Sequence, residues 1–304
     1  MAYYETVRRI LIMIFLINIA TALAKGGYGL LTGSLSMSAD GVHSLFDGTS
    51  NIIGLVGISL ASRPADKEHP YGHSKFETFA SLAIAMLLFI SAMELALAAI
   101  NRLQSPSTPQ ITEISFAVMV ITILINIGVS AYEYILGKRL RSSILVADSL
   151  HTRSDILASL GVILGLAAVE MGYPQVDPVI ALLICGLIVM TGIEIIRESS
   201  QVLLDKALLE ESQIIDLAES VHGVCTCHGV RTRGTAGEIF IDLHIGVDSS
   251  LSIDAAHKVS EEVESMIKSR IPRVRDVMVH LEPKDYCDLK AQRESQSSNN
   301  NGSQ

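Results

Sequence analysis

The nine residues ADSLHTRSD at positions 147–155 decide how this chain folds. They place three charged side chains and one histidine inside an otherwise apolar run from Ser143 to about Gly172. A run of this length can cross the hydrocarbon core of a bilayer, which needs about 20 mostly apolar residues. Ionisable residues inside a span are costly and usually functional. The stretch therefore indicates a membrane helix that carries a working site.

The same pattern occurs a second time in the chain. ADGVHSLFD at positions 39–47 lies 108 residues earlier, and both stretches read A-D-x-x-H-[ST]-x-x-D. Three predicted spans separate equivalent positions, so the two halves have opposite topology. Inverted repeats of this kind are typical of secondary transporters, in which the site lies near the midplane between the repeats.

The spacing within each motif places a histidine and an aspartate on one helix face. His43 and Asp47 are four residues apart, as are His151 and Asp155, and such pairs share a face. Four nitrogen and oxygen ligands suit a tetrahedral Zn²⁺ site, and two carboxylates neutralise a divalent ion. The alternative is that these polar side chains only hold helices together.

Other polar residues inside the spans are weaker signals. Asp40 and Asp148 each precede a motif histidine by three residues. They either orient its ring from behind or line a hydrated path. Five more residues are expected to face other helices or to lie near span ends: Lys25, Asn51, Glu94, Asn126 and Glu133.

Composition and loop charge extend this interpretation to six spans. The 304 residues are 49% hydrophobic and 18% charged, against about 25% charged in soluble domains, which argues against a soluble enzyme. The spans are predicted at 10–31, 36–62, 76–101, 114–137, 143–172 and 178–198. Ten Lys and Arg residues fall on the N-terminal side of the membrane and Arg102 on the other. This asymmetry predicts a multi-pass protein of the cell membrane with both termini cytoplasmic.

The last third of the chain has a different character. We divide the sequence into a transmembrane domain (1–207), a cytoplasmic domain (208–286) and a polar tail expected to be disordered (287–304). Residues 208–304 carry 16 of the 32 acidic residues, which argues against nucleic-acid binding. Apolar periodicity predicts helix 211–222, strands 224–233 and 238–247, helix 253–270 and strand 274–281. The order α-β-β-α-β indicates a small α+β sandwich.

Metal-type side chains recur in this domain and in one loop. Strand alternation puts His244 on the polar face, and His280 and Glu282 on one face of the last strand. As a cluster they favour regulatory or structural metal binding over solvated histidines. The Cys225-x-Cys227-His228 sequence is a weak soft-metal signal. In the loop, Asp66, His69 and His73 could close around a metal, or belong to a solvated loop that starts the third span.

These motifs together resemble the cation diffusion facilitator family of divalent-metal/proton antiporters, over roughly residues 5–286. The resemblance rests on Gly33-Ser-Leu-Ser with the first A-D-x-x-H repeat, on Pro64-Ala-Asp-x-x-His-Pro-Tyr-Gly-His-x-Lys-x-Glu77, and on the second repeat. It implies a transporter rather than an enzyme. It also implies a homodimer whose six-helix protomers each carry a ferredoxin-like cytoplasmic domain similar to a copper chaperone.

The resemblance also implies roles for individual residues. The transport site would be His43, Asp47, His151 and Asp155, the loop site Asp66, His69 and His73, and the dimer charge pair Lys75 and Asp205. A binuclear cytoplasmic centre would use His228, His244, His257, His280 and Glu282, although Glu282 stands where Asp is usual. The quartet favours Zn²⁺ as substrate and regulatory ligand, with no cofactor, and Cd²⁺ or Co²⁺ as passengers.

Three alternatives remain at this point. The same antiporter could carry Fe²⁺, Mn²⁺, Co²⁺ or Cd²⁺ as its main substrate. The chain could instead be a membrane metal sensor or partner subunit that does not transport. An intramembrane metalloenzyme would need an open metal position and a general base, whereas the quartet fills all four positions and the sequence has no H-E-x-x-H.

Overall fold

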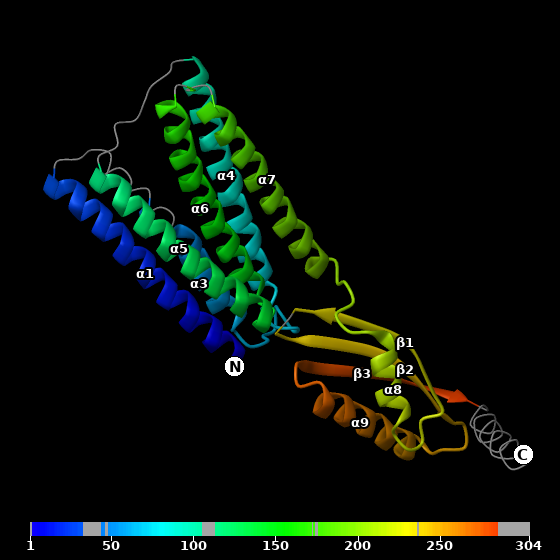
Figure 1. Cartoon of the computed structure of the whole chain (residues 1–304). Coiled ribbons are helices and arrows are strands. Elements are labelled where there is room, and N and C mark those ends of the chain that lie inside the picture. Colours follow the sequence, from blue (N-terminus) through cyan, green and yellow to red (C-terminus); the bar gives the residue numbers. More distant parts are fainter. Residues whose placement is uncertain are drawn as a thin grey trace, which may run out of the picture. The chain divides into compact units, whose positions relative to one another are not determined.

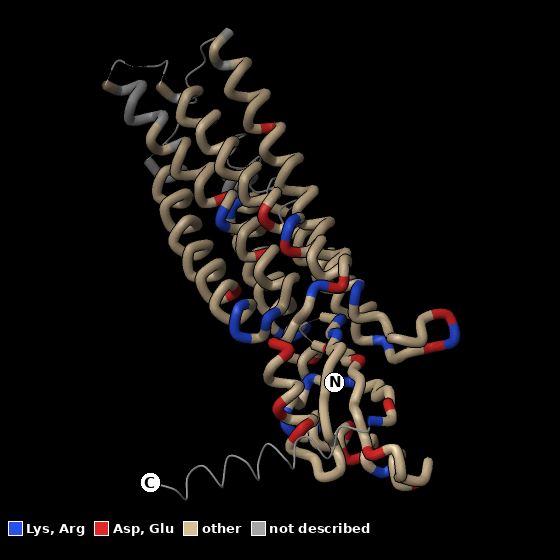
Figure 2. Tube along the Cα trace, turned by 90° about the vertical axis from the view of Figure 1, so that its right-hand side faces the viewer, with Lys and Arg blue, Asp and Glu red and all other residues tan. Residues whose placement is uncertain are grey.

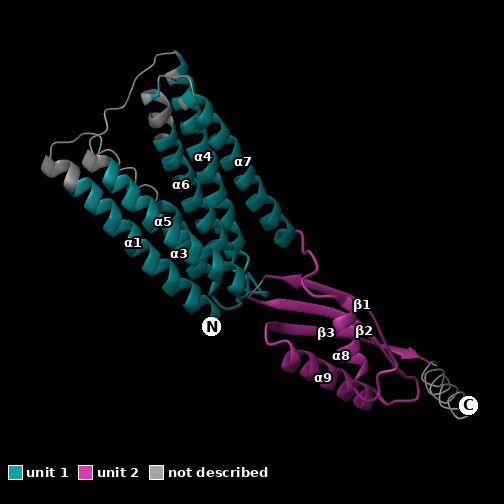
Figure 3. Ribbon diagram, viewed as in Figure 1, with its two compact units in different colours: residues 1–203 teal, residues 204–304 magenta. Residues whose placement is uncertain are grey.

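The computed structural model describes residues 2–32, 44–45, 48–104, 113–171, 173, 176–235 and 237–284. The chain forms two compact units, Met1–Leu203 and Leu204–Gln304 (Figure 3). The first unit consists of helices, and the second combines helices with a sheet (Figure 1).

The long helices of the first unit follow the predicted spans. They are α1 (Ala2–Thr32), α3 (Thr49–Ala61), α4 (Phe76–Gln104), α5 (Glu113–Leu140), α6 (Ser143–Glu170) and α7 (Val176–Leu203). Four of them, α1, α4, α5 and α7, are long and apolar enough to cross a membrane. Helix α6 has the length but carries Asp148, Arg153 and Asp155, and α3 is a short apolar helix. The count of six spans therefore stays a prediction.

Helix α6 lies among the other helices of this unit. It packs against α3, α4, α5 and α7, while α1 packs against α3 and α5. At Gly161 a Cβ would lie 2.4 Å from Ile184 of α7, so the absence of a side chain lets α6 and α7 approach closely. Charged residues are sparse along the helices and more frequent toward one end of them (Figure 2).

A buried carboxylate anchors the start of α6. Glu77 of α4 is 3% exposed. It accepts hydrogen bonds from the Tyr3 hydroxyl of α1 at 2.9 Å and from the Ser142 hydroxyl at 2.7 Å. Because a helix N-terminus favours a negative charge, this contact fixes the beginning of α6 relative to α1 and α4.

The second unit has the predicted order α-β-β-α-β. It comprises α8 (Glu211–Glu219), β1 (Thr226–Gly234), β2 (Ile239–Asp248), α9 (Ile253–Arg270) and β3 (Val274–Lys284). The sheet order is β1-β2-β3, with β1 antiparallel and β3 parallel to β2. Ser252 caps the N-terminus of α9, since its hydroxyl accepts a hydrogen bond from the Ala255 amide at 3.2 Å.

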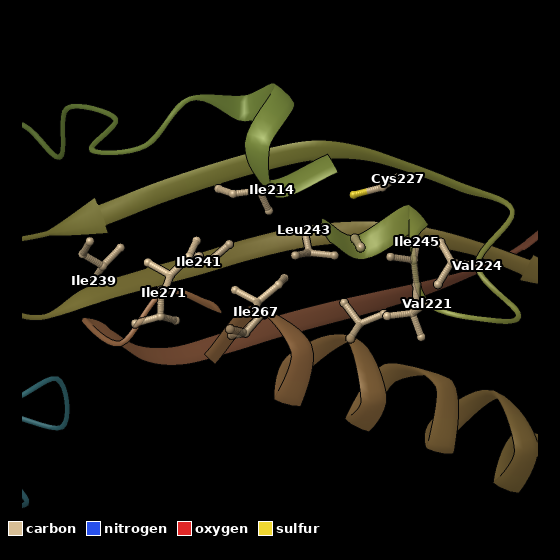
Figure 4. Packing of buried hydrophobic residues seen from close by; sticks show 14 of the residues in the cluster. Ile214, Val221, Val224, Cys227, Ile239, Ile241, Leu243, Ile245, Ile267 and Ile271 are labelled. Carbon is tan, nitrogen blue, oxygen red and sulfur yellow. The ribbon is translucent and has the colours of Figure 1, made fainter. Parts of the chain in front are cut away.

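One face of this sheet carries the core. Leu243 and Ile245 of β2 are fully buried together with Val263 and Ile267 of α9. Figure 4 shows Leu243, Ile245 and Ile267 among the side chains between the strands and the helices. Because strand side chains alternate, His244 points to the opposite face. Sites on that face are therefore built without disturbing the core.

Candidate metal sites

Half of the predicted transport quartet lies in the described part of the chain. His151 is 4% exposed and Asp155 is half-buried, one helical turn apart on α6. His43 and Asp47, together with Asp40, lie outside the described residues. The quartet as a four-ligand site therefore stays a prediction.

Asp148 sits one turn before His151 and is fully buried. Its Oδ2 accepts a hydrogen bond from the Asn51 amide of α3. The Asn51 side-chain oxygen accepts in turn from the Asn18 amide of α1 at 2.7 Å. These two hydrogen bonds connect α1, α3 and α6 at the level of the repeated A-D-x-x-H-[ST]-x-x-D motif. The sequence identified Asn51 only as a polar residue within a span, because periodicity does not reveal partners on other helices.

The loop before α4 brings its three predicted ligands together. Nδ1 of His69 lies 3.4 Å from Asp66 Oδ1, and Nε2 of His73 lies 3.4 Å from Asp66 Oδ2. One ligand atom from each residue lies within 4.8 Å of the others. The His73 Nδ1 lies 3.1 Å from the Pro64 carbonyl oxygen. With that nitrogen donating, Nε2 is left as the electron-pair donor.

The loop also holds Asp66 in its charged form. The backbone amides of His69 and Glu68 donate to its Oδ1 at 2.7 Å and 2.9 Å. The hydrogen bond from the His69 amide is the main reason why the pKa of Asp66 lies below its ordinary value. An ionised carboxylate beside two imidazoles is a donor set that suits Zn²⁺.

The second unit contains another group, on the sheet face opposite the core. His228 and His244 are directly paired across β1 and β2. Glu282 of β3 reaches both, with Oε1 at 2.9 Å from His244 Nδ1 and Oε2 at 3.4 Å from His228 Nε2. The hydrogen bond from His244 is the main cause that lowers the pKa of Glu282. Three strands thus supply one ligand atom each within 4.8 Å.

Local backbone geometry brings His228 toward this face. The register between β1 and β2 shifts after His228, and Gly229 has a φ of 64°. A Cβ on Gly229 would lie 3.3 Å from the His244 ring. Glycine therefore meets both the left-handed backbone and the close approach of the imidazole.

The other predicted ligands of this centre take different positions. The His280 ring lies 4.7 Å from that of His244, between ring centroids. His257 lies on the exposed face of α9, where its Nε2 is 3.5 Å from Glu261. Within one protomer the structure thus leaves His257 apart from the group. Cys227 belongs to the core, and burial raises the pKa of its thiol to about 11, so the C-x-C-H sequence does not form one ligand face.

The remaining predicted residues belong to different units. Lys75 precedes α4, while Asp205 follows α7 and has a φ of 53°. Their role as a dimer charge pair stays a prediction.

Comparison with known proteins assigns both units. Residues 11–204 match the family model described as the cation efflux transmembrane domain, and residues 208–284 match the cytoplasmic domain of cation efflux proteins. The chain belongs to the cation efflux, or cation diffusion facilitator, family. The resemblance inferred from the motifs is therefore confirmed, and the protein is a multi-pass membrane transporter of metal cations.

Individual relatives agree with this assignment. The cation-efflux pump FieF of Serratia proteamaculans is 34% identical over 83% of this chain and 84% of its own length. Metal tolerance protein C1 of Arabidopsis thaliana is 30% identical over 88% of this chain and 60% of its own. A cadmium form of a MamM CTD variant is 29% identical, with a TM-score of 0.24, over 25% of this chain and 93% of that one. The cytoplasmic dimerisation domain is consistent with a homodimer.

Proposed function

We propose that this protein exports divalent metal ions, with Zn²⁺ as the preferred substrate, in exchange for protons by alternating access. The observation that carries the proposal is the pair of His151 and Asp155 on α6, a helix surrounded by membrane helices of a cation efflux domain. We propose His43 and Asp47 of the first repeat as the other two ligands. The protein would lie in the cell membrane as a homodimer, with both termini cytoplasmic.

Proton exchange follows from the chemistry of the donor set. A metal binds neutral imidazole and ionised carboxylate, so binding releases protons from the site. An ordinary imidazole titrates near pH 6.5, which allows metal and protons to replace one another close to neutral pH. An inward proton gradient would then drive metal outward.

The His228–His244–Glu282 group supports a second role for metal. Its three ligand atoms face away from the domain core, where an ion from the cytoplasm can reach them. We propose that metal bound there, together with the loop site at Asp66, His69 and His73, favours the transporting dimer. His257 and His280 would contribute to the same regulatory centre.

The test is metal flux into proteoliposomes under an imposed pH gradient. We expect Zn²⁺ flux that requires the gradient and that falls at least about 100-fold in Asp155→Asn, because about 3 kcal/mol of lost charge pairing corresponds to that factor. Glu198→Gln, which alters an exposed carboxylate at the end of α7, serves as the matched control.

Each other result has a definite meaning. Preferred flux of Fe²⁺, Mn²⁺, Co²⁺ or Cd²⁺ would overturn the choice of substrate but keep the mechanism. Equal flux with and without the gradient would contradict proton exchange. No flux of any ion from a folded dimer would favour a sensor or partner subunit.

A further inference from the structure

Two buried carboxyl groups of the membrane unit are not among the proposed metal ligands. Glu133 of α5 and Asp148 of α6 are both fully buried, and these two helices pack directly against each other. The Ser130 hydroxyl of α5, three residues before Glu133, donates to the Ser149 carbonyl oxygen of α6 at 2.9 Å, and a Cβ on Gly137, four residues after Glu133, would lie 3.0 Å from Val146. These two contacts lie on either side of Glu133 and Asp148, so the two carboxyl groups lie on the facing sides of α5 and α6. They therefore form one polar site rather than two separate ones.

The available donors satisfy only part of this pair. The Asn51 amide donates to Asp148 Oδ2. Neither Asp148 Oδ1 nor either oxygen of Glu133 receives a hydrogen bond from any residue that the structure describes. A buried polar atom without a partner costs roughly 1–3 kcal/mol, and more when it is charged.

Ionisation of the two carboxyl groups would add to the cost of leaving their oxygens without hydrogen bonds. Two adjacent ionised carboxylates repel one another, and burial removes the water that would screen them. One proton resolves both problems, because a protonated Glu133 becomes a donor and Asp148 Oδ1 is the acceptor beside it. Asp148 then accepts at both of its oxygens.

We propose that Glu133 and Asp148 form a proton-binding acid pair that holds one proton in this conformation. The proton belongs to the pair, as in other carboxyl dyads that share one. The pair is distinct from the proposed metal ligands His43, Asp47, His151 and Asp155. In this pair, Asp148 accepts the proton of Glu133.

Among the described residues, the hydrogen-bonding side chains that reach this network are neutral. The helices α1 and α3 contribute the neutral amides of Asn18 and Asn51 to this network. On α6, the guanidinium of Arg153 lies over the Tyr134 ring, 5.4 Å from its centroid. Neither oxygen of Glu133 receives a hydrogen bond from a Lys or Arg among the described residues. His151 is a titratable group one turn along α6 from Asp148.

The position of the pair suggests how its proton would be used, and this step rests on the proposed function. Asp148 precedes His151 by three residues, about 4.5 Å along the helix axis. Glu133 and Asp148 lie toward the end of α5 and α6 that carries Lys138 and Ser143. A proton held there lies between that end and the proposed transport ligands. We therefore assign it to the protons exchanged for metal.

Infrared spectroscopy of the metal-free, full-length protein in lipid nanodiscs at pH 7 tests the pair directly. We expect a carbonyl stretch of a neutral carboxylic acid that disappears in Glu133→Gln. The glutamine amide can donate to Asp148 in place of the acid proton, so this variant is expected to fold. Glu198→Gln should leave the band intact. Asp148→Asn changes the partner of Glu133 and must shift or remove the same band.

A band that is absent from the wild type, or that persists unchanged in Glu133→Gln, would overturn the proposal. If Glu133→Gln fails to fold, Asp148→Asn becomes the deciding variant. A band that stays unchanged in Asp148→Asn would then overturn the proposal. Either result is independent of transport, since no metal is present.

Proton counting tests the link to transport. The number of protons moved per Zn²⁺ in proteoliposomes should fall by about one in Glu133→Gln, because the amide cannot exchange a proton. An unchanged ratio would overturn the assignment of this proton to exchange. Absence of zinc-driven proton movement in the wild type would instead contradict the proposed function, and the infrared band would still decide whether the pair exists.

Discussion

The two units place similar side chains in opposite surroundings. In the membrane unit, Asp148 and His151 are buried, and the Asn51 amide of α3 donates to Asp148. In the cytoplasmic unit, His228, His244 and Glu282 lie on the sheet face that turns away from the core. Under the proposed function, burial would couple the first group to helix packing and to protons, and exposure would leave the second group accessible to cytoplasmic metal. The same residue types would then serve exchange in one unit and sensing in the other.

The largest expected effect is a difference in stability between alanine variants of two adjacent residues of β2, Leu243 and His244. Leu243→Ala removes a fully buried core side chain and should lower the free energy of unfolding of the cytoplasmic unit by about 2–5 kcal/mol. His244→Ala lies on the other face and should cost less than about 1 kcal/mol without metal. Hydrogen exchange of β2 amides in the full-length protein measures both values. Equal losses would contradict the separation of core and ligand faces.

An intermediate effect is expected for the metal affinity of the cytoplasmic group. Glu282→Gln should weaken Zn²⁺ binding there by about tenfold or more, because a ligating carboxylate is lost. Competition with a chromophoric chelator measures this affinity. Asp276→Asn, which alters an exposed carboxylate of β3 that pairs with Lys268, is the matched control and should bind as the wild type does.

The pH dependence of that affinity has a definite sign. His244 lowers the pKa of Glu282, so this carboxylate stays ionised until the pH falls below about 4, the ordinary range for Glu. The stabilisation from its hydrogen bond is present above that range and is lost as the pH falls through the lowered pKa. Zinc affinity should already fall between pH 7.5 and 5.5, because imidazoles gain protons there. A fall in zinc affinity with its midpoint near pH 4 would contradict the expectation that protonation of imidazoles, and not of Glu282, weakens binding first.

A small effect is expected at the bulge of β1. Gly229→Ala places a side chain at a φ of 64° and close to the His244 ring. The cost to the free energy of unfolding should be about 1 kcal/mol, and the displaced imidazole should also weaken metal binding. Thermal unfolding of the full-length protein with and without Zn²⁺ separates the two contributions. A destabilisation seen only with metal would show that the backbone itself is not strained.

Local periodicity explains why much of the fold could be predicted. Alternation along residues 239–248 placed Leu243 inside and His244 outside, and apolar runs located α1, α4, α5 and α7. Segment ends were less accurate, since α8 ends at Glu219 and not at His222. Helix ends depend on capping and packing, which periodicity does not encode.

The candidate sites could be predicted only where metal-binding residue types occur close together along the sequence. The spacing of His151 and Asp155 marks one helix face, and three residues of one loop mark the group at Asp66. The pairing of Glu133 with Asp148 joins residues of two helices that pack together, and Asn51 approaches from a third. Such pairings depend on how α3, α5 and α6 pack. A single sequence therefore identifies polar residues in spans but not their partners.

The most direct test of the division of labour compares Zn²⁺ flux, as a function of cytoplasmic Zn²⁺ concentration, in two variants. Asp155→Asn should abolish flux at every concentration. The double variant His228→Ala with His244→Ala should keep the maximal flux but need a higher concentration to reach half of it. Persistent flux in Asp155→Asn, or loss of maximal flux in the cytoplasmic double variant with the dimer intact, would contradict the account.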